Sequence, residues 1–361
     1  MRKIIVIVGL AATVALPADA SALRYASPGG VSTGPCATPA TACSLETAVE
    51  GDGVDDPVNG EEVIVLPGAY TQTSDLQTGI LNLNIHGAAG QPTPVINASG
   101  IGRTSVLTGS ISDLRFESST ITETVNLSAG SANRIFIRSS SNGSQPACQC
   151  YGQQLRNSAI VATGTAPALG ISSNGGSATM TYRNVTAYSA NAASPALRVQ
   201  QIGMSGILNF NAFNLIAYNA AGGTDIVADG PDAYVTLTNS NYRSTVLDDS
   251  GVIVDETGTP PHQTATPLFT NAAAADLSQL PGSPTVDAGL FDLQNGDSDL
   301  AGKPRTAGVT TDIGAYEFQP PAPPGNPGKA KKCKKKKKGK KNAAAAKKKK
   351  KGCKKKRKKK R

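Results

Sequence analysis

Short apolar runs recur between Val63 and Val254, and Gly, Asn, Ser or Pro residues interrupt the chain between them. Each run has the length and alternation of a β-strand, and almost nothing in this region has a helical period. We therefore predict an all-β fold. The runs occupy residues 63–66, 81–85, 135–137, 159–161, 207–210, 235–237 and 252–254.

A looser repeat underlies the runs, because an asparagine follows apolar residues in four of the units. Asn157, Asn184, Asn214 and Asn239 are spaced 27, 30 and 25 residues apart. Repeats of this length are typical of stacked architectures, and units made only of strands favour a parallel β-helix. Stacked asparagine side chains would then form a hydrogen-bonded ladder. About nine coils fit between residues 60 and 290. A β-sandwich is the alternative, although few Asn-Gly hairpin turns appear.

The charges are divided very unevenly between the end of the chain and the rest. Residues 329–361 hold 23 of the 36 Lys and Arg residues and no acid, whereas residues 1–328 hold the other 13 basic residues and all 26 acidic ones. The body therefore carries −13, and the overall charge of +10 describes neither part. We expect the tail to be disordered when free and to need an anionic partner.

The N-terminus resembles an export signal. Arg2 and Lys3 precede an apolar stretch over residues 4–16, and Ala18-Asp19-Ala20 has the small-x-small cleavage pattern. A membrane anchor is the alternative, but the stretch falls short of the roughly 20 residues that span a bilayer. We predict a signal peptide over residues 1–20 and an exported mature chain without a transmembrane segment.

Disulfides are the default for cysteines in an exported chain. We predict a Cys36–Cys43 bridge, which closes a short loop. Cys148 and Cys150 are poorly placed for an unstrained bridge and, without a nearby histidine, form a weak zinc site. The pairing of Cys148, Cys150, Cys333 and Cys353 stays open.

Two stretches resemble bacterial secreted right-handed parallel β-helix proteins of the pectin-lyase-like superfamily. Near the start, Cys36, the segment 43–49 (CSLETAV) and the segment 63–70 (VIVLPGAY) resemble the family's cysteine, helix and strand ending in PGxY. Glu46-Thr47 stands where the family usually has Arg-Glu. Near the end, segments 283–289 (SPTVDAG), 299–305 (DLAGKPR) and 312–317 (DIGAYE) are similar to the choice-of-anchor Q domain. The resemblance implies a right-handed β-helix whose closing domain precedes a surface anchor.

These observations define an expected domain organisation. The signal peptide precedes an N-terminal cap region over residues 21–62, in which Ser44 caps a helix ending at Glu50. A single β-helix covers residues 63–318, and its C-terminal cap begins at about residue 267. Residues 319–328 form a proline-rich spacer, and residues 329–361 form the lysine-rich tail.

No complete catalytic constellation is evident. According to the resemblance, enzymes with this fold use calcium-binding carboxylates with an arginine base, or paired aspartates with a histidine. The chain has only His86 and His262, which we interpret as a turn residue and a surface residue. Asp248 and Asp249 form the one strand-associated acid pair, and we interpret them as a solvated turn. The sequence therefore leaves enzyme activity uncertain and favours a non-enzyme.

No cofactor is expected, with calcium as the one candidate. Asp292, Asn295, Asp297 and Asp299 place oxygen ligands within eight residues. The competing interpretation is that these residues shape a tight cap, in which Asp287 and Asp312 bind backbone amides.

The predicted function is that of an exported protein of the bacterial envelope, structural, adhesive or glycan-binding, with a glycan on the β-helix face. Its tail would bind anionic envelope polymers or lipid head groups rather than intracellular nucleic acid. Extracellular DNA and a merely solubilising tail are alternatives, and a lyase or glycoside hydrolase acting on acidic polysaccharide is the alternative function. The predicted anion-binding residues are Lys334, Lys335, Lys336, Lys337, Lys338, Lys347, Lys348, Lys349, Lys350, Lys351, Lys354, Lys355, Lys356 and Arg357.

Overall fold

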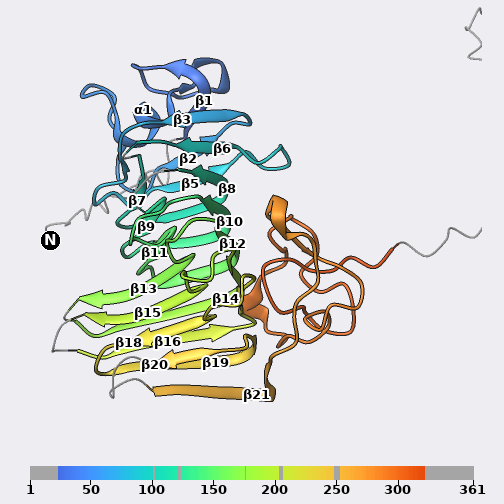
Figure 1. Cartoon of the computed structure of the whole chain (residues 1–361). Coiled ribbons are helices and arrows are strands. Elements are labelled where there is room, and N and C mark those ends of the chain that lie inside the picture. The colour runs from blue at the N-terminus through green and yellow to red at the C-terminus, as the bar shows by residue number, and fades with distance from the viewer. Residues whose placement is uncertain are drawn as a thin grey trace, which may run out of the picture. The chain divides into compact units, whose positions relative to one another are not determined.

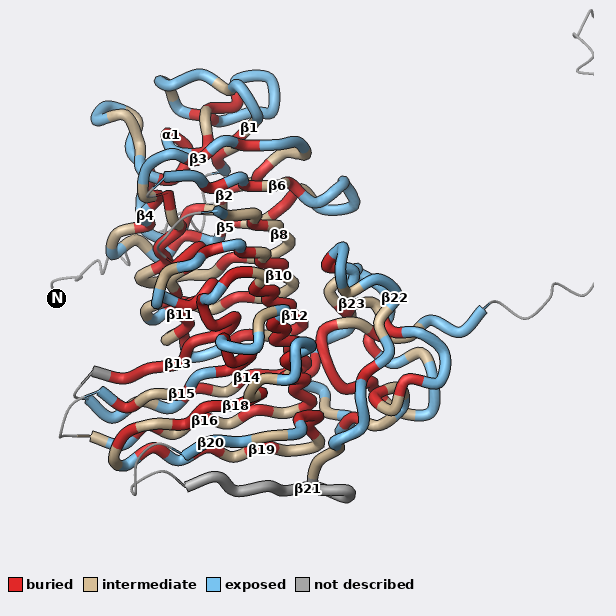
Figure 2. Tube along the Cα trace, viewed as in Figure 1, coloured by how far each residue is buried: buried red, intermediate tan, exposed pale blue. Residues whose placement is uncertain are grey.

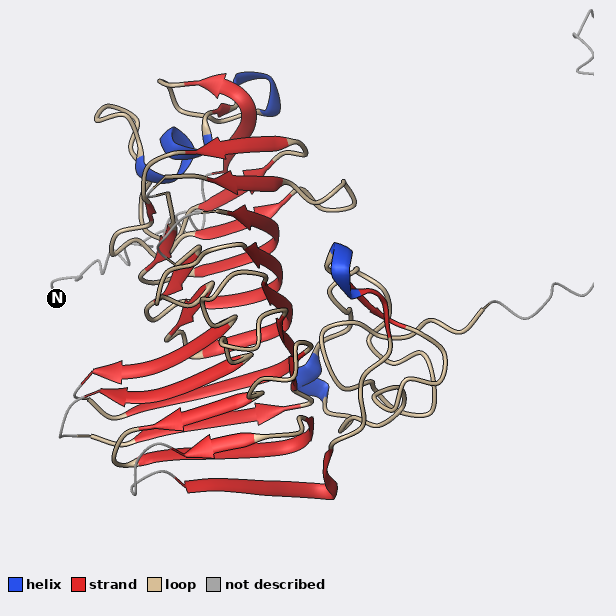
Figure 3. Cartoon of the chain, viewed as in Figure 1, coloured by secondary structure: helices blue, strands red, loops and turns tan. Residues whose placement is uncertain are grey.

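Successive turns of the chain lie on one another as parallel strands in the computed structural model (Figure 1). The structure describes residues 23–100, 102–119, 123–174, 176–202, 206–247 and 253–321. The predicted signal peptide, the Asp248-Asp249 pair, most of the spacer and the whole tail lie outside them. Residues up to Pro320 belong to one compact unit. Strands dominate this unit, as Figure 3 shows.

The strands form two large parallel sheets and one small antiparallel pair. The thirteen-stranded sheet contains β1 (Leu23–Val31), β2 (Glu62–Val65), β3 (Ala69–Gln72), β5 (Asn84–Gly87), β6 (Val95–Ala98), β8 (Ser110–Ser118), β10 (Ser131–Ser139), β12 (Gln154–Ala162), β14 (Ala178–Ser189), β16 (Leu208–Phe213), β17 (Ile216–Asn219), β19 (Ala233–Asn241) and β21 (Ile253–Gln263). The eight-stranded sheet contains β4 (Leu76–Gln77), β7 (Thr104–Val106), β9 (Val125–Leu127), β11 (Cys148–Cys150), β13 (Leu169–Asn174), β15 (Leu197–Ile202), β18 (Ile226–Asp229) and β20 (Thr245–Leu247). Strands β22 (Phe269–Asn271) and β23 (Asp276–Gln279) form the antiparallel pair.

Helical structure in the described residues is confined to α1 (Leu45–Glu50) and the short 3₁₀ turns η1 (Pro39–Thr41), η2 (Ala272–Ala274) and η3 (Leu293–Asn295). The predicted cap of α1 is confirmed, because the Thr47 amide donates to Ser44 Oγ at 3.1 Å. None of these helical segments has the length and apolar character needed to cross a membrane.

The architecture confirms the predicted parallel β-helix and excludes the sandwich. Its core is a column of inward side chains in one register, which Figure 2 shows as buried positions running through the stack. The column runs through Val63, Ile85, Ile111, Ala132, Leu155, Tyr182, Ala212 and Leu237. Each fully buried aliphatic or aromatic side chain contributes about 1.5–3 kcal/mol. The hydrophobic core therefore continues from coil to coil.

The stack differs from the expectation in length and at both ends. The eight strands of the smaller sheet bound seven turns between β4 and β20, fewer than the nine expected. Strand β1, which the sequence did not predict, adds a parallel strand before β2. The residues after Gln263 leave the stack instead of extending or closing it. We call residues 264–320 the arm.

The arm packs against the outer face of the thirteen-stranded sheet. That face carries apolar side chains at Phe136, Val161 and Tyr188, which form one cluster with buried arm residues Leu277 and Ala315. The Ala315 amide also donates to Thr186 Oγ1 at 3.0 Å. The arm therefore covers an apolar strip on the side of the stack.

Candidate functional site

A row of polar positions crosses the outer face of the eight-stranded sheet. Strand alternation points every second residue away from the core, and the register aligns these residues from one coil to the next. The row comprises Gln77, Ser105, Asn126, Gln149, Gly170 and Arg198. Amides and hydroxyls can each donate and accept hydrogen bonds, so this face presents mainly neutral polar groups.

The row deepens into a hollow of about 330 Å³ around Gly170, which we call the amide hollow. Gly170 lies between Gln149 and Arg198 in register. A Cβ atom at residue 170 would lie 2.4 Å from Pro146 Cγ, so the close approach of Pro146 requires glycine. Pro146, Pro167 and Tyr151 line the hollow with less polar surface.

Several polar groups of the amide hollow are free to form hydrogen bonds with a ligand. Gln149 Nε2 donates to Ser172 Oγ at 3.3 Å, and Gln200 Nε2 donates to Asp229 Oδ2 at 3.0 Å. Each amide oxygen is thereby left as an acceptor. The Arg198 guanidinium makes no hydrogen bond or ion pair with the described parts of the chain. An unpaired guanidinium next to amide oxygens suits a ligand that carries both a carboxylate and hydroxyl groups.

The amide hollow does not present the groups that glycosidic cleavage needs. Hydrolysis uses two carboxylates that flank the bond, and calcium needs several oxygen ligands. No carboxylate is among the residues that line the hollow. Asp229 lies beside the hollow, but its Oδ2 accepts the bond from Gln200. The lining of the hollow therefore supplies hydrogen-bonding groups and one cation.

The predicted asparagine ladder is present on the other sheet. Asn184 Nδ2 donates to Asn157 Oδ1 at 3.1 Å, and Asn214 Nδ2 donates to Asn184 Oδ1 at 2.9 Å. Asn239 shares with them a left-handed backbone, with φ between 47° and 56° for the four. Asparagine tolerates this conformation better than most residues.

The column of residues with a left-handed backbone begins two coils before Asn157. Its first two residues form an ion pair, which the sequence did not predict. Asp113 and Arg134 have φ values of 56° and 51° in the two preceding coils. Arg134 Nε and Nη2 donate to the two carboxylate oxygens of Asp113 at 2.7 and 2.6 Å. Their shared position in the repeat could have predicted this ion pair, because each residue directly follows one member of the register pair Ser112 and Asn133.

The structure does not gather the four predicted calcium ligands into a cluster. Asp292 accepts from Arg183 Nη1 at 2.8 Å and caps η3. Asn295 Nδ2 donates to the Leu290 carbonyl at 2.8 Å. Asp297 is exposed, and Asp299 accepts from the Lys303 and Glu317 amides at 2.7 and 2.9 Å. Within the described residues, no group of three His, Cys, Asp or Glu could hold a metal ion. Calcium binding stays a prediction.

The competing interpretation, a cap shaped by aspartates, matches the contacts in the arm. The Asp287 amide donates to Asp312 Oδ1 at 2.7 Å, and the Val309 amide donates to Asp287 Oδ1 at 2.6 Å. Both aspartates bind backbone amides as expected. Their hydrogen bonds stabilise the arm itself, whereas the predicted cap would have closed the end of the stack.

A buried cluster of three carboxylates and one guanidinium lies at the centre of the arm. Arg305, which is 2% exposed, donates to the carbonyls of Asp312 and Ala315 and lies 3.4 Å from Glu317 Oε2. Burial lowers the pKa of Arg305 and raises the pKa of Asp299 and Asp312. Burial also raises the pKa of Glu317 to about 7, although the Asp312 and Ala307 amides donate to it.

Neither histidine lies in the amide hollow. His86 Nε2 lies 2.7 Å from Glu62 Oε1, in a second hollow that Asp113 and Arg134 also line. The ring of His262 stacks on Tyr242, with 4.7 Å between the ring centroids. The interpretation of His86 as a turn residue is therefore wrong, because His86 lies within strand β5 and pairs with Glu62 of the neighbouring strand.

The cysteines of the described chain are paired. The predicted Cys36–Cys43 disulfide is confirmed, and Cys148 and Cys150 also form a disulfide. Both Cys148 and Cys150 are fully buried. These two thiols are therefore not a zinc site in this structure. Cys333 and Cys353 lie outside the described residues.

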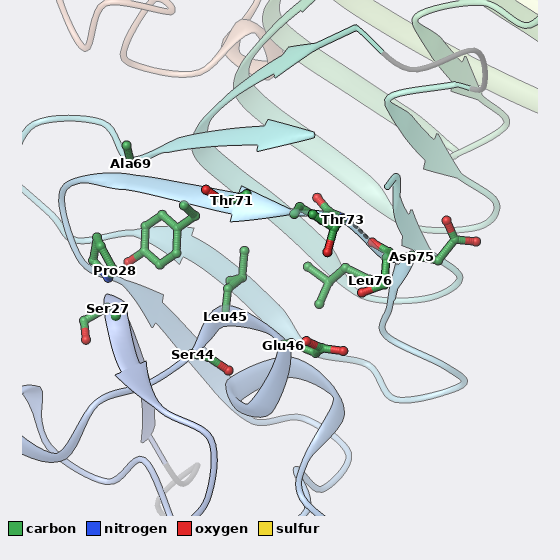
Figure 4. Close-up of a pocket in the computed structure, with 14 residues that line it drawn as sticks. Ser27, Pro28, Ser44, Leu45, Glu46, Ala69, Thr71, Thr73, Asp75 and Leu76 are labelled. Carbon is green, nitrogen blue, oxygen red and sulfur yellow. Dashed lines mark hydrogen bonds between the residues drawn. The ribbon is translucent and has the colours of Figure 1, made fainter. Parts of the chain in front are cut away.

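A further hollow of about 300 Å³ lies between α1 and β3 (Figure 4). Leu45, Tyr70 and Leu76 form its floor, and each is at least nine-tenths buried. Glu46 and Asp75 stand at its rim. We call it the N-terminal hollow.

Comparisons with known proteins assign no family to the chain. No protein-family model matches the chain, and no curated protein matches it. Among solved structures, the chain is similar to the crystal structure of pectate lyase Pel9A, with 10% identity and a TM-score of 0.42. The match covers 82% of this chain and 96% of that one.

Proposed function

We propose that the protein is an exported, envelope-associated β-helix that binds an acidic glycan along its eight-stranded sheet. The observation that carries this proposal is the unpaired Arg198 guanidinium beside the amide oxygens of Gln149 and Gln200. A uronic acid residue offers a carboxylate to the guanidinium and hydroxyls to the amides. The polar row along the sheet would extend the contact to neighbouring sugar units.

Glycan binding is tested by calorimetric titration with polygalacturonate, its carboxyl-reduced neutral form and a neutral glucan. We expect binding to polygalacturonate alone, and Arg198→Ala should weaken it about tenfold or more, because a charge-assisted hydrogen bond is lost. Arg156→Ala is the matched control, since Arg156 is a half-buried arginine of the other sheet that donates only to the Gln294 carbonyl. Equal affinity for the acidic and reduced polymers would overturn the proposal.

The alternative function, a lyase or hydrolase, is tested on the same polymers. Release of unsaturated or reducing ends by the full chain would show that the protein is an enzyme. We expect neither product, because the amide hollow is lined by no carboxylate.

We further propose that the tail holds the protein to anionic envelope polymers or lipid head groups. The support is its 23 basic residues without an acid, since each lysine near an anionic surface adds about 1 kcal/mol. A chain ending at Gly328 should leave the envelope fraction at a lower salt concentration than the full chain. Equal retention of the two chains would show that the tail is not the anchor.

A further inference from the structure

One column of outward positions on the thirteen-stranded sheet changes from polar to apolar along the stack. Register pairs align its members, which are Thr71, Asn97, Glu117, Arg138, Val161, Tyr188 and Tyr218. The arm packs on the apolar members, since Val161 and Tyr188 belong to the cluster that includes Leu277 and Ala315. The four polar members before Val161 are not part of that cluster. Packing of the arm therefore does not account for them.

A hollow of about 420 Å³ opens over these four polar residues, and we call it the arginine hollow. The guanidinium of Arg138 makes no hydrogen bond or ion pair with any residue that the structure describes. Glu117, its neighbour in register, is paired instead with Arg115, whose Nε lies 2.8 Å from Glu117 Oε1. Among these three side chains, one positive charge is therefore not neutralised, and it belongs to the arginine that lines the hollow.

The other polar groups of the arginine hollow offer mainly acceptors. Asn97, Ser140 and Thr163 each donate from the side chain to a backbone carbonyl of the preceding coil, at 3.3, 3.3 and 3.2 Å. Their amide and hydroxyl oxygens remain as acceptors. Glu117 Oε2 also accepts no hydrogen bond from the described residues. A ligand here needs hydroxyl or amide donors as well as an anionic group.

This combination distinguishes between classes of anion. A phosphate or sulfate ion presents mainly acceptors, so it would satisfy Arg138 and leave the acceptor oxygens without donors. A sugar acid carries a carboxylate for the guanidinium and hydroxyl donors for those oxygens. The planar guanidinium can bind the carboxylate through two parallel hydrogen bonds. The arginine hollow therefore suits a uronic acid unit better than an inorganic anion.

We propose that the arginine hollow is a second site for an acidic sugar, with Arg138 as its carboxylate-binding residue. This inference does not rest on the amide hollow, whose residues come from other strands. The turns after β10 and β12 nevertheless line both hollows, with Ser140 and Thr163 in the arginine hollow and Ser144 and Pro167 in the amide hollow. Each pair is four residues apart in sequence, which spans at most about 14 Å. One acidic polymer can therefore occupy both hollows, and the second contact raises its affinity.

Arginine-specific labelling of the full chain with phenylglyoxal, read by mass spectrometry, tests the site. Polygalacturonate at about ten times its dissociation constant should slow the labelling of Arg138 about tenfold. The carboxyl-reduced polymer should leave the rate unchanged, and so should inorganic phosphate at the same concentration of anionic groups. Arg156 is the internal control, because it lies on the same sheet outside the hollow, and its labelling rate should not change.

Variants separate this site from the amide hollow. Arg138→Ala should lower the affinity for polygalacturonate about tenfold, because a charge-assisted hydrogen bond is lost. Arg138→Lys should restore only part of that affinity, since an ammonium group lacks the planar fork. Protection of Arg138 from labelling should persist in Arg198→Ala, and this result would support the second site even where the amide hollow binds nothing.

Three results would overturn the proposal. The first is labelling of Arg138 at the same rate with and without polygalacturonate. The second is equal protection by inorganic phosphate, which would assign the hollow to small anions. The third is loss of protection in Arg198→Ala, which would show that Arg138 is only screened by a polymer bound at the amide hollow.

Discussion

The side-chain amide of Asn184 donates to the side-chain oxygen of Asn157 at 3.1 Å and also lies 3.5 Å from the Asn295 carbonyl of the arm. Asn157 and Asn214 likewise donate to arm carbonyls, those of Asn295 and Leu290, at 2.9 and 3.0 Å. The asparagine ladder thus has two roles. It joins neighbouring coils, and it holds the arm against the side of the stack.

Asn184→Ala should destabilise the fold by about 3 kcal/mol. The substitution removes bonds on both sides of the ladder, leaves buried partners unsatisfied and places alanine at a φ of 54°. Chemical denaturation measures the loss. Asn209→Ala, on the outward side of β16, is the control and should cost less than about 0.5 kcal/mol. Equal losses would contradict the structural role of the ladder.

Gly170→Ala should cost about 1–3 kcal/mol and also weaken glycan binding. Its Cβ would meet Pro146 Cγ at 2.4 Å, and the movement that relieves this clash changes the wall of the amide hollow. Thermal unfolding and the polygalacturonate titration give the two readouts. Gly176→Ala is the matched control, since nothing lies within 4 Å of a Cβ there. Unchanged binding by Gly170→Ala would mean that the hollow is not the ligand site.

Arg183→Met should loosen the arm without unfolding the stack. Arg183 pairs with Asp292 of the arm at 2.8 Å and lies over the Phe213 ring, and methionine keeps only the apolar contact. Losing one partly buried pair, worth about 1–2 kcal/mol, should increase proteolysis of the arm roughly tenfold. Limited proteolysis of the full chain measures this rate. Arg138→Met, which lies outside the arm contacts, should not change it.

The arm should become less stable as the pH rises from about 4.5 to 7. Burial raises the pKa of Glu317 to about 7 from its ordinary 4.5, so between these values the folded arm binds more protons than the unfolded arm. Stability then falls with rising pH, by up to about 3 kcal/mol, and stays constant above pH 7. Raised pKa values of Asp299 and Asp312 act in the same direction.

Hydrogen exchange of the arm amides between pH 4.5 and 8 measures this effect after correction for intrinsic exchange rates. Glu317→Gln, which keeps the shape but cannot ionise, should remove most of the slope. An unchanged slope in this variant would assign the pH dependence to another group.

Local features of the sequence were sufficient to predict the repeated strands, the α1 cap and the asparagine ladder. Strand alternation and a 25–30-residue period depend on neighbouring residues, so they can be read directly. No local sequence pattern marks the residues of the amide hollow. Gln149, Gly170 and Arg198 come from three different coils and look ordinary until the register aligns them.

The sequence alone determined that the chain stacks short strands, because every coil repeats the same local pattern and each inward side chain needs a neighbour above and below. It also determined the separation of an acidic body from a cationic tail. The position of the arm was decided only by tertiary structure. Its aspartates bind arm amides, and its carbonyls and apolar residues meet coils that lie more than 50 residues away in sequence. Such contacts depend on which faces the stacking leaves exposed, and no local pattern encodes that.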